Sequence, residues 1–379
     1  MAARITILGA GFAGLELATT LSERLGSKAE ITLVDHRDAF MFGFHKLNVL
    51  FEGTSPEKLR MPYGRFTKPA VRFLKASVEA IDPRTKRVAI DGGAIDADFL
   101  VVAMGADYDW DAAPGLVRGA NDFYTLEGAQ ALHASLSQFA GGHIVIGAAS
   151  APFKCPPAPS ECAFLMHDWL TRRGVRAKSE ITLVLPLGSP VPPSPDMSKA
   201  IIASFAELGI RFVPNRRVAS IDAARGVAIL DDGSELPHEL FLGIPKHYAP
   251  KVVRESGLPL TENGFVKVDP RTLDTGFDGV YAVGDVAFTG APKVGVMAEG
   301  AARAVASALA RRVLGEGEIL LNAGAGTCYL EFGGGRVAAV DVDFFSGPKP
   351  TGVYHAPEAK WREAKEKFSA ARRSRWFGM

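Results

Sequence analysis

The chain has 379 residues, of which 47% are hydrophobic and 22% are charged, proportions typical of a folded protein with a substantial core. The formal net charge of +1 gives no reason to expect nucleic acid or another polyanion as a partner. Three cysteines are too few for a disulfide-stapled scaffold, and no Cys/His spacing indicates a metal site.

The first segment predicts a strand, a glycine turn, a helix and a second strand. Residues 4–8 and 30–34 are apolar runs, and residues 12–26 have helical periodicity. The turn reads Gly9-Ala10-Gly11-Phe12-Ala13-Gly14, a GxGxxG pattern that follows a strand and opens a helix. Asp35 ends the second strand, where a carboxylate can bind ribose hydroxyls. This unit therefore predicts a dinucleotide site.

Each position in the turn has a physical role. Gly9 permits the tight turn, Gly11 lets the backbone approach a pyrophosphate, and Gly14 lets helix and strand pack closely. Phe12 and Ala13 open the helix, whose free N–H groups and dipole attract an anion. We expect these residues and Asp35 to hold the dinucleotide.

A second strand-helix-strand unit follows later in the chain. Residues 143–146 and 180–185 are apolar runs, and residues 160–173 are helical in pattern. Two such units predict an α/β fold with two interleaved dinucleotide-binding domains. Further elements are predicted as a hairpin over 78–91, strands over 99–103 and 280–283, a long helix over 295–313, an antiparallel segment over 322–346 and a basic helix over 358–377.

Two further segments resemble motifs of two-dinucleotide-binding flavoproteins. Residues 101–106 resemble the strand and Thr-Gly turn before the first crossover, with Met104 in place of Thr, and residues 280–285 resemble the second FAD motif. The resemblance implies that the cofactor is FAD and that Asp285 bonds the ribitol chain. The helix that begins near Gly295 would direct its N-terminus at the flavin. The other residues expected to contact FAD are Ala103, Gly105, Gly284, Lys293 and Val296.

The second unit lacks what a nicotinamide dinucleotide requires. After its first strand the sequence reads Gly147-Ala148-Ala149-Ser150-Ala151-Pro152, which keeps only the first glycine of the fingerprint. Its second strand ends at Leu185-Pro186, without a carboxylate for a ribose or an arginine for a 2′-phosphate. We therefore expect electrons to come from another donor.

A cysteine loop occupies the position of the missing fingerprint. It reads Phe153-Lys154-Cys155-Pro156-Pro157-Ala158-Pro159-Ser160-Glu161-Cys162. Cys155 lies beside Lys154 and just before a helix N-terminus, and both features favour a thiolate. Glu161 falls in the first helical turn, where it either handles a proton or complements the helix dipole. Cys162 continues an apolar run and is interpreted as a core cysteine.

This loop resembles the Cys-Pro-Pro-x-Pro-x-Glu segment of sulfide:quinone oxidoreductases and of flavocytochrome c sulfide dehydrogenase flavoprotein subunits. Thr327-Cys328-Tyr329 resembles the second cysteine segment of that family. The resemblance extends from Gly9 to about Phe345. It implies that Cys155 and Cys328 form a redox pair over the flavin and that Glu161 acts as the base.

The sequence also departs from that family. Residues 106–123 lack the third cysteine of many quinone-reducing members, and residues 42–45 lack the cysteine through which the cytochrome-linked members attach their flavin. We therefore expect non-covalent FAD, with a link to His45 as the less favoured alternative. The electron acceptor, quinone or a cytochrome, stays open.

The last residues are rich in Lys and Arg, and Trp361, Ala364, Phe368 and Ala371 recur at helical spacing. Such a helix is expected either to rest on anionic lipid or to pack on the FAD domain. No signal peptide or membrane-spanning run is visible in the sequence, which predicts a cytoplasmic protein or one peripheral to a membrane.

We expect a discontinuous FAD-binding domain over residues 1–106 and 272–321, a degenerate second domain over 107–271 and a C-terminal interface or membrane-side segment over 322–379. The predicted function is FAD-dependent oxidation of sulfide, or of a related sulfur compound, through Cys155 and Cys328. The alternative is an NAD(P)H-dependent reductase of quinone or a small redox protein. The oligomeric state stays open.

Overall fold

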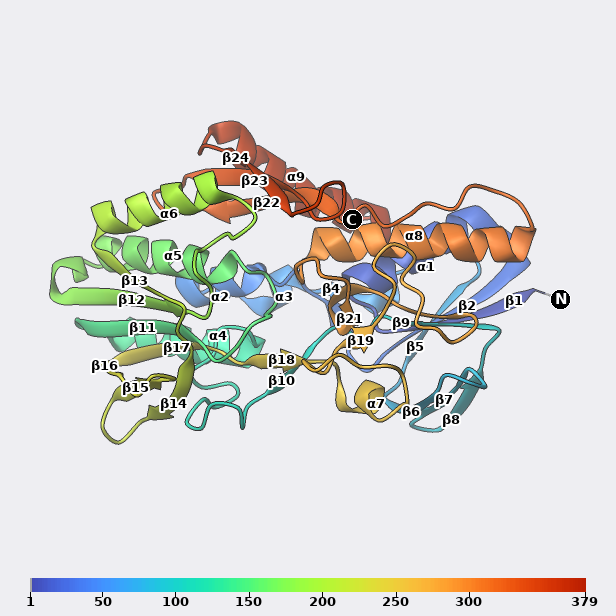
Figure 1. Cartoon of the computed structure of the whole chain (residues 1–379), viewed down its shortest axis with the longest axis horizontal. Helices are drawn as coiled ribbons and strands as arrows, with labels where there is room; N and C mark the ends of the chain where they lie inside the picture. The colour runs from blue at the N-terminus through green and yellow to red at the C-terminus, as the bar shows by residue number, and fades with distance from the viewer. Residues whose placement is uncertain (1) are drawn as a thin grey trace.

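The computed structural model describes residues 2–379 and divides them between two lobes that lie side by side along the long axis of the molecule (Figure 1). The first lobe contains a parallel sheet in the strand order β20-β9-β1-β2-β5. Its central strands are apolar on both faces, as a parallel sheet covered on both sides requires. The strands are β1 (Ala3–Leu8), β2 (Ala29–Asp35), β5 (Val71–Lys75), β9 (Phe99–Val102) and β20 (Val280–Ala282).

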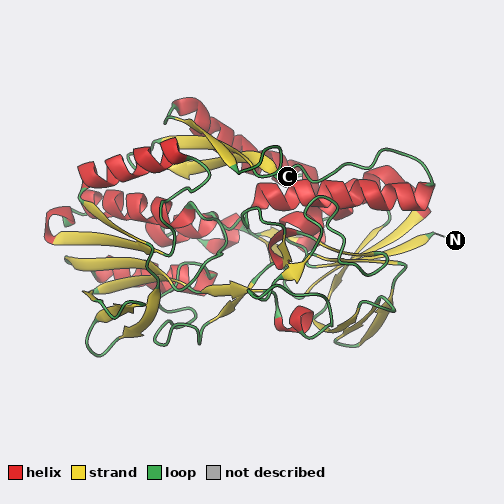
Figure 2. Ribbon diagram, viewed as in Figure 1, coloured by secondary structure: helices red, strands yellow, loops and turns green. Residues whose placement is uncertain are grey.

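Two long helices pack against each other in the first lobe. α1 (Phe12–Leu25) follows β1 through the glycine turn, and α8 (Gly295–Leu314) follows β20. Alanines make up most of the buried face of α8, and their small side chains allow the close approach to α1. Figure 2 shows α8 lying over the strands of this lobe.

The second lobe contains a parallel sheet in the order β13-β12-β11-β17. β11 (Gly142–Ala148), α5 (Ala158–Arg172) and β12 (Ser179–Leu185) repeat the strand-helix-strand unit that the sequence predicted. The lobe also contains α4 (Leu126–Gln138), α6 (Pro195–Leu208), β13 (Ile210–Pro214) and β17 (Leu240–Ile244). The predicted α/β fold class is thus confirmed.

Smaller elements complete the lobes. β6 (Val78–Asp82) and β7 (Arg87–Ile90) form the predicted hairpin, which β8 (Gly93–Asp96) extends. β14 (Val218–Asp222), β15 (Val227–Leu230) and β16 (Glu235–Pro237) form a similar sheet in the second lobe. Between β2 and β5 lie β3 (Ala39–Phe40), α2 (His45–Glu52), α3 (Pro56–Leu59) and β4 (Met61–Pro62).

The chain crosses between the lobes several times, and two of these crossings pair with each other. β10 (Asp107–Asp109) leads out of the first lobe and β18 (Lys246–Tyr248) leads back, as antiparallel neighbours. The predicted return at residue 271 is too late, because residues just after β18 already pack in the first core. These are Ala249, Val253, Leu258 and Val266. This stretch contains α7 (Lys251–Arg254) and β19 (Val266–Lys267), which pairs with β21 (Ala287–Phe288).

The C-terminal segment contacts both lobes. β22 (Ala325–Glu331), β23 (Val337–Asp343) and β24 (Thr351–His355) form an antiparallel sheet whose apolar residues join the second core. α9 (Ala359–Phe377) then runs toward the first lobe (Figure 1), where Trp376 and Phe377 enter the first core. The sequence predicted β22, β23 and α9 and missed β24. Within residues 2–379, every helix is too short or too polar to cross a bilayer.

Candidate functional site

The glycine turn has the geometry that a bound dinucleotide needs. Gly9 has a φ of +101°, and a Cβ there would lie 2.4 Å from the carbonyl oxygen of Ala103. A Cβ on Gly14 would lie 1.8 Å from the carbonyl oxygen of Gly9, so helix and strand touch at this point. A Cβ on Gly11 would meet nothing within 4 Å. The turn is therefore tight where it packs and open where a pyrophosphate would approach.

The start of α1 has no competing acceptor from its own chain. Gly11 caps the helix without a side-chain hydrogen bond, and the first turn contains no acidic residue. Asp35 is buried and accepts a 2.8 Å bond from the Ala10 N–H. Its carboxylate also receives Arg37, at 2.7 and 2.9 Å, which holds the pKa of Asp35 low although burial alone would raise it. This arrangement fits an anionic dinucleotide at the helix N-terminus.

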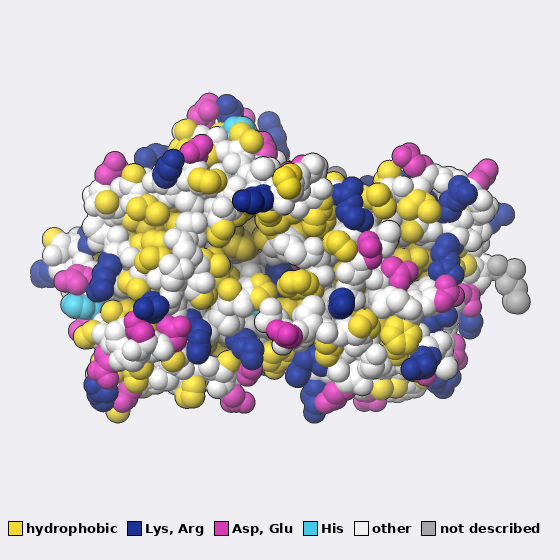
Figure 3. Space-filling model, viewed as in Figure 1, with side chains coloured by type: hydrophobic (Ala, Val, Ile, Leu, Met, Phe, Trp, Pro, Cys, Tyr) yellow, Lys and Arg dark blue, Asp and Glu magenta, His cyan; other side chains and the backbone are white. Residues whose placement is uncertain are grey.

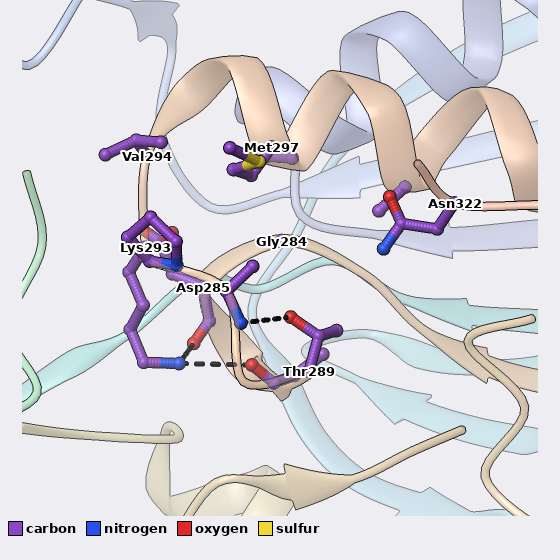
Figure 4. Close-up of a pocket in the computed structure, with 12 residues that line it drawn as sticks. Gly284, Asp285, Thr289, Lys293, Val294, Met297 and Asn322 are labelled. Atoms are coloured by element: carbon purple, nitrogen blue, oxygen red, sulfur yellow. Dashed lines mark hydrogen bonds between the residues drawn. The ribbon is translucent and has the colours of Figure 1, made fainter. Parts of the chain in front are cut away.

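A second helix start lies beside the first, because a Cβ on Gly295 would lie 2.7 Å from the ring of Phe12. α8 also begins without a side-chain cap or an acidic first turn. Gly284, Asp285, Lys293 and Val294 line a small cavity beside it (Figure 4). Among residues 2–379, the Asp285 carboxylate has no hydrogen-bond or ion-pair partner. These features fit the FAD contacts that the sequence predicted, with Asp285 available to a hydroxyl.

The ammonium of Lys293 binds backbone carbonyl oxygens. Its ammonium lies 2.7 Å from the carbonyl oxygen of Asp285 and 3.1 Å from that of Ala287 (Figure 4), and 3.5 Å from the centre of the Phe265 ring. The side chain is only 7% exposed, and burial lowers its pKa to about 8. Lys293 thus fixes the loop that precedes α8, and a direct contact with FAD stays a prediction.

The two cysteine motifs both reach the start of α8. The Cys155 N–H donates a 2.8 Å bond to the carbonyl oxygen of Lys293, two residues before the helix. A Cβ on Gly326 of β22 would lie 2.6 Å from a methyl group of Val296, so this strand touches the first turn of α8. Cys328 follows on the same strand, and all three cysteines are free. Figure 3 shows hydrophobic side chains gathered where the two lobes meet.

The expected thiolate at Cys155 is contradicted. Burial raises the pKa of the Cys155 thiol, and Glu161 and Cys328 raise it further. Lys154 does not offset this effect, because its ammonium bonds the carbonyl oxygen of Ala106 at 3.0 Å and lies 4.3 Å from the centre of the Tyr108 ring. Burial, with Glu161 and Asp341, likewise raises the pKa of Cys328 to about 12. In the reduced protein both environments therefore favour the thiol over the thiolate.

Cys155 itself has an unusual backbone conformation. Its φ is +53°, in the left-handed region that residues with a side chain rarely adopt. The bond to Lys293 and a following turn, in which Ala158 N–H donates to the Cys155 carbonyl at 2.8 Å, hold this conformation. Such strain at a reactive residue is common at functional sites. Cys162, by contrast, lies fully buried in the second core, as predicted.

Glu161 belongs to a charged cluster that connects three elements. It lies on α5 and is 2% exposed. The N–H of Glu331, on β22, donates to it at 3.1 Å, and the ammonium of Lys365, on α9, lies 3.3 Å from the same oxygen. Lys365 also lies 2.9 Å from the carboxylate of Glu331. Glu161 is therefore a buried carboxylate with a charged partner. A glutamate that only complemented the helix dipole would not need such a partner.

The sequence gave no sign of Lys365 in this cluster. It stands among other basic residues of α9, and only the docking of that helix brings it to Glu161. A second missed residue is His247 on β18, which is 2% exposed and lies between the rings of Tyr108 and Tyr124. No spacing rule could have found either residue, because each partner is distant in the sequence.

The degenerate dinucleotide site is filled with protein. A Cβ on Gly147 would lie 2.5 Å from a methyl group of Val218, and Ala148 and Ala149 are buried. β12 ends at Leu185, which is fully buried, so no ribose-binding carboxylate stands there. The structure thus agrees with a second lobe that lacks the groups a nicotinamide dinucleotide needs.

Comparison with known proteins gives consistent matches. The family model described as pyridine nucleotide-disulphide oxidoreductase matches residues 3–308. A mitochondrial sulfide:quinone oxidoreductase of Dictyostelium discoideum is 25% identical over 74% of this chain and 65% of its own length. A sulfide-quinone reductase of Aquifex aeolicus is 27% identical over 81% of this chain and 76% of its own length. The match thus spans less than two thirds of the Dictyostelium protein.

The fold also resembles a solved structure. The crystal structure of the sulfide:quinone oxidoreductase from Aquifex aeolicus superposes with a TM-score of 0.85 and 23% sequence identity. The superposition covers 98% of this chain and 90% of the other. This likeness extends to the whole arrangement of two lobes and C-terminal segment.

Proposed function

The chain belongs to the pyridine nucleotide-disulphide oxidoreductase family, and from that premise we propose that it oxidises sulfide, or a related reduced sulfur compound, through Cys155 and Cys328. Electrons would pass through FAD to a quinone or a cytochrome. Membership of the family confirms that the protein is an oxidoreductase and that FAD is its cofactor. Sulfide and quinone appear in the names of relatives and are proposals for this chain.

One observation carries the proposal. Two cysteine segments that are far apart in the sequence converge on the first turn of α8, where the sequence also predicts the flavin ring. Cys155 is held there by its bond to Lys293, and β22, which also contains Cys328, approaches Val296 at Gly326. A cysteine pair in this position suits two-electron exchange between sulfur and flavin.

Each of these residues has its own role in the proposed reaction. In the oxidised enzyme, Cys155 and Cys328 are joined by a disulfide or a bridging sulfur. Hydrosulfide attacks one sulfur, the bond between the cysteines breaks, and a persulfide forms on one cysteine while the other leaves as a thiolate. Glu161 accepts the proton that the persulfide releases. FAD, when bound, accepts the two electrons that are given up when the sulfur pair closes again.

Burial of the sulfurs affects the reduced pair. Because burial raises the pKa of both thiols, the reduced pair gains little stability as free thiolates. Sulfur would leave as a polysulfide or on an acceptor thiol. We propose non-covalent FAD, and the attachment of flavin to His45 stays the less favoured alternative.

The test is an anaerobic titration of the purified holoenzyme with sulfide, NADH and NADPH, followed by flavin absorbance. Sulfide should bleach the flavin, and the two nicotinamides should not. Cys155→Ser and Cys328→Ser should each slow the bleaching by about a hundredfold or more, since covalent catalysis is lost. Cys162→Ala is the matched control and should react like the wild type. Fast bleaching by NADH, or normal rates in both serine variants, would defeat the proposal.

A further inference from the structure

The C-terminal helix supplies one charged residue to the cysteine site. Lys365 lies on α9, and its side chain is 19% exposed. Its ammonium contacts Glu161, on the helix that follows Cys155, and Glu331, on the strand that contains Cys328. One lysine therefore bridges the two elements that hold the cysteines.

The charge balance around Glu161 depends on this lysine. The Glu161 side chain is 3% exposed, and a carboxylate that is buried without a cation would take up a proton. Lys365 is the only cation that forms an ion pair with Glu161 among residues 2–379. Although burial alone would lower the pKa of Lys365, Glu161 and Glu331 raise it, so the ammonium stays charged.

Other titratable groups face Glu161 and do not replace Lys365. Glu331 and Cys328 approach from β22, and Cys155, Cys162 and Tyr124 lie on the other sides. Each of these groups is neutral or negative, so none can balance the negative charge of the Glu161 carboxylate. Burial and Glu161 raise the pKa of Cys155, and the charge of Lys365 offsets a small part of this rise.

Resting on the proposed function, we propose that Lys365 is a positioning residue of the redox site: its ion pairs hold Glu161 as a carboxylate beside Cys155, ready to accept the proton from sulfur. Lys365 does not itself touch the reacting atoms. It acts through Glu161, and the docking of α9 completes the site that α5 and β22 begin.

The first measurement is the pH profile of flavin reduction by sulfide in the anaerobic holoenzyme. In Lys365→Met the acid limb should move to higher pH by about one unit or more, because the buried Glu161 carboxylate then has no charged partner. Lys365→Arg keeps the charge and should restore most of the rate. Lys367→Met is the matched control, because it removes an exposed lysine of the same helix.

A double-mutant comparison tests whether Lys365 acts through Glu161. Lys365→Met should slow reduction in the wild-type background and add little in a Glu161→Gln background. A slowdown by the same factor at every pH and in both backgrounds would mean a structural role and overturn the inference. An unchanged pH profile in Lys365→Met would overturn it as well.

Infrared spectroscopy gives a readout that needs no activity. Lys365→Met should show a protonated-carboxyl band at a pH where the wild type and the Lys365→Met/Glu161→Gln double variant show none. If sulfide fails to reduce the wild-type flavin, the proposed function falls, and this band still decides the role of Lys365. Absence of the band from Lys365→Met would refute it.

Discussion

Three glycines of one turn occupy three different environments. Gly14 touches the carbonyl of Gly9, and Gly9 touches the carbonyl of Ala103, whereas the space beside Gly11 is open. The motif alone does not separate these roles, because all three positions require glycine in the bound state. In the structure, two glycines serve the packing of the fold and one serves the approach of the ligand.

This difference predicts opposite outcomes for two similar variants. Gly14→Ala should destabilise the protein by about 3 kcal/mol or more, because its Cβ would collide with backbone. Gly11→Ala should leave the thermal stability of the FAD-free protein unchanged and weaken FAD binding by about tenfold or more. Thermal melts of the apoprotein and fluorescence titration with FAD measure both. Equal melting temperatures for the two variants would contradict this interpretation.

At the residue scale, the motifs selected residues on elements that the fold brings together, but one electrostatic contact was misjudged. Cys155 bonds the segment before α8, and Glu161 bonds β22, the strand that contains Cys328. Lys154 was expected to favour the Cys155 thiolate and instead contacts Ala106 and Tyr108. Adjacency in the sequence does not fix the direction of a long side chain, which is set by tertiary packing.

At the scale of elements, the contacts of α9 show where the end of the C-terminal segment packs. Glu16 of α1 is 1% exposed and receives Arg375 and the Trp376 indole N–H, each at 2.9 Å. Arg372 makes a similar pair with Glu299 of α8. Trp376 is 1% exposed, so the end of α9 is occupied by protein contacts rather than free to enter a lipid surface. Packing on the FAD domain is therefore what the structure shows, and membrane contact stays a prediction.

Removing this anchor should release the helix. Trp376→Ala should cost about 3–5 kcal/mol and leave Glu16 with one donor fewer. Limited trypsin digestion should then cut α9 at its basic residues much faster than in the wild type. Lys367→Ala, on the exposed face, should digest at the wild-type rate. Equal digestion of Trp376→Ala and wild type would show that α9 is held by other contacts.

The elements that the sequence predicted are those with strong periodicity or a motif at one end, such as α1, β11 and α8. The missed helices α2, α4 and α6 lie between motifs, and α2 belongs to the first lobe in sequence while its apolar residues pack in the second core. The boundary after β18 was missed for a similar reason. Its position depends on which core the residues join, and periodicity does not report that.

At the scale of the whole molecule, the paired crossings β10 and β18 place His247 between the lobes. Its Nδ1 lies 2.8 Å from the carbonyl oxygen of Pro245 and must donate, and among residues 2–379 its buried Nε2 has no hydrogen-bond partner, which disfavours a second proton. Burial lowers the pKa of His247 well below its usual value, and Lys154 lowers it further. Below about pH 6.5 the unfolded chain therefore binds a proton that the folded chain does not.

The free energy of unfolding should accordingly fall by about 1.4 kcal/mol per pH unit below pH 6.5 on account of His247. His247→Asn keeps a donor for Pro245 and removes the titrating group. Urea unfolding of both proteins between pH 7.5 and 5.5 measures the difference, which should narrow as the pH falls. A difference that stays constant over this range would show that the pKa of His247 is the same in the folded and the unfolded chain.

The anchoring of α9 on α1 also has a consequence for biosynthesis. Glu16 is made early, yet its partners Arg303, Arg375 and Trp376 are made late. Until α9 has been synthesised, Glu16 has only Arg303 of these three partners, and the aromatic pocket around Phe12 lacks its tryptophan. Completion of the flavin-binding lobe thus waits for the synthesis of α9, long after the strands of that lobe have been translated.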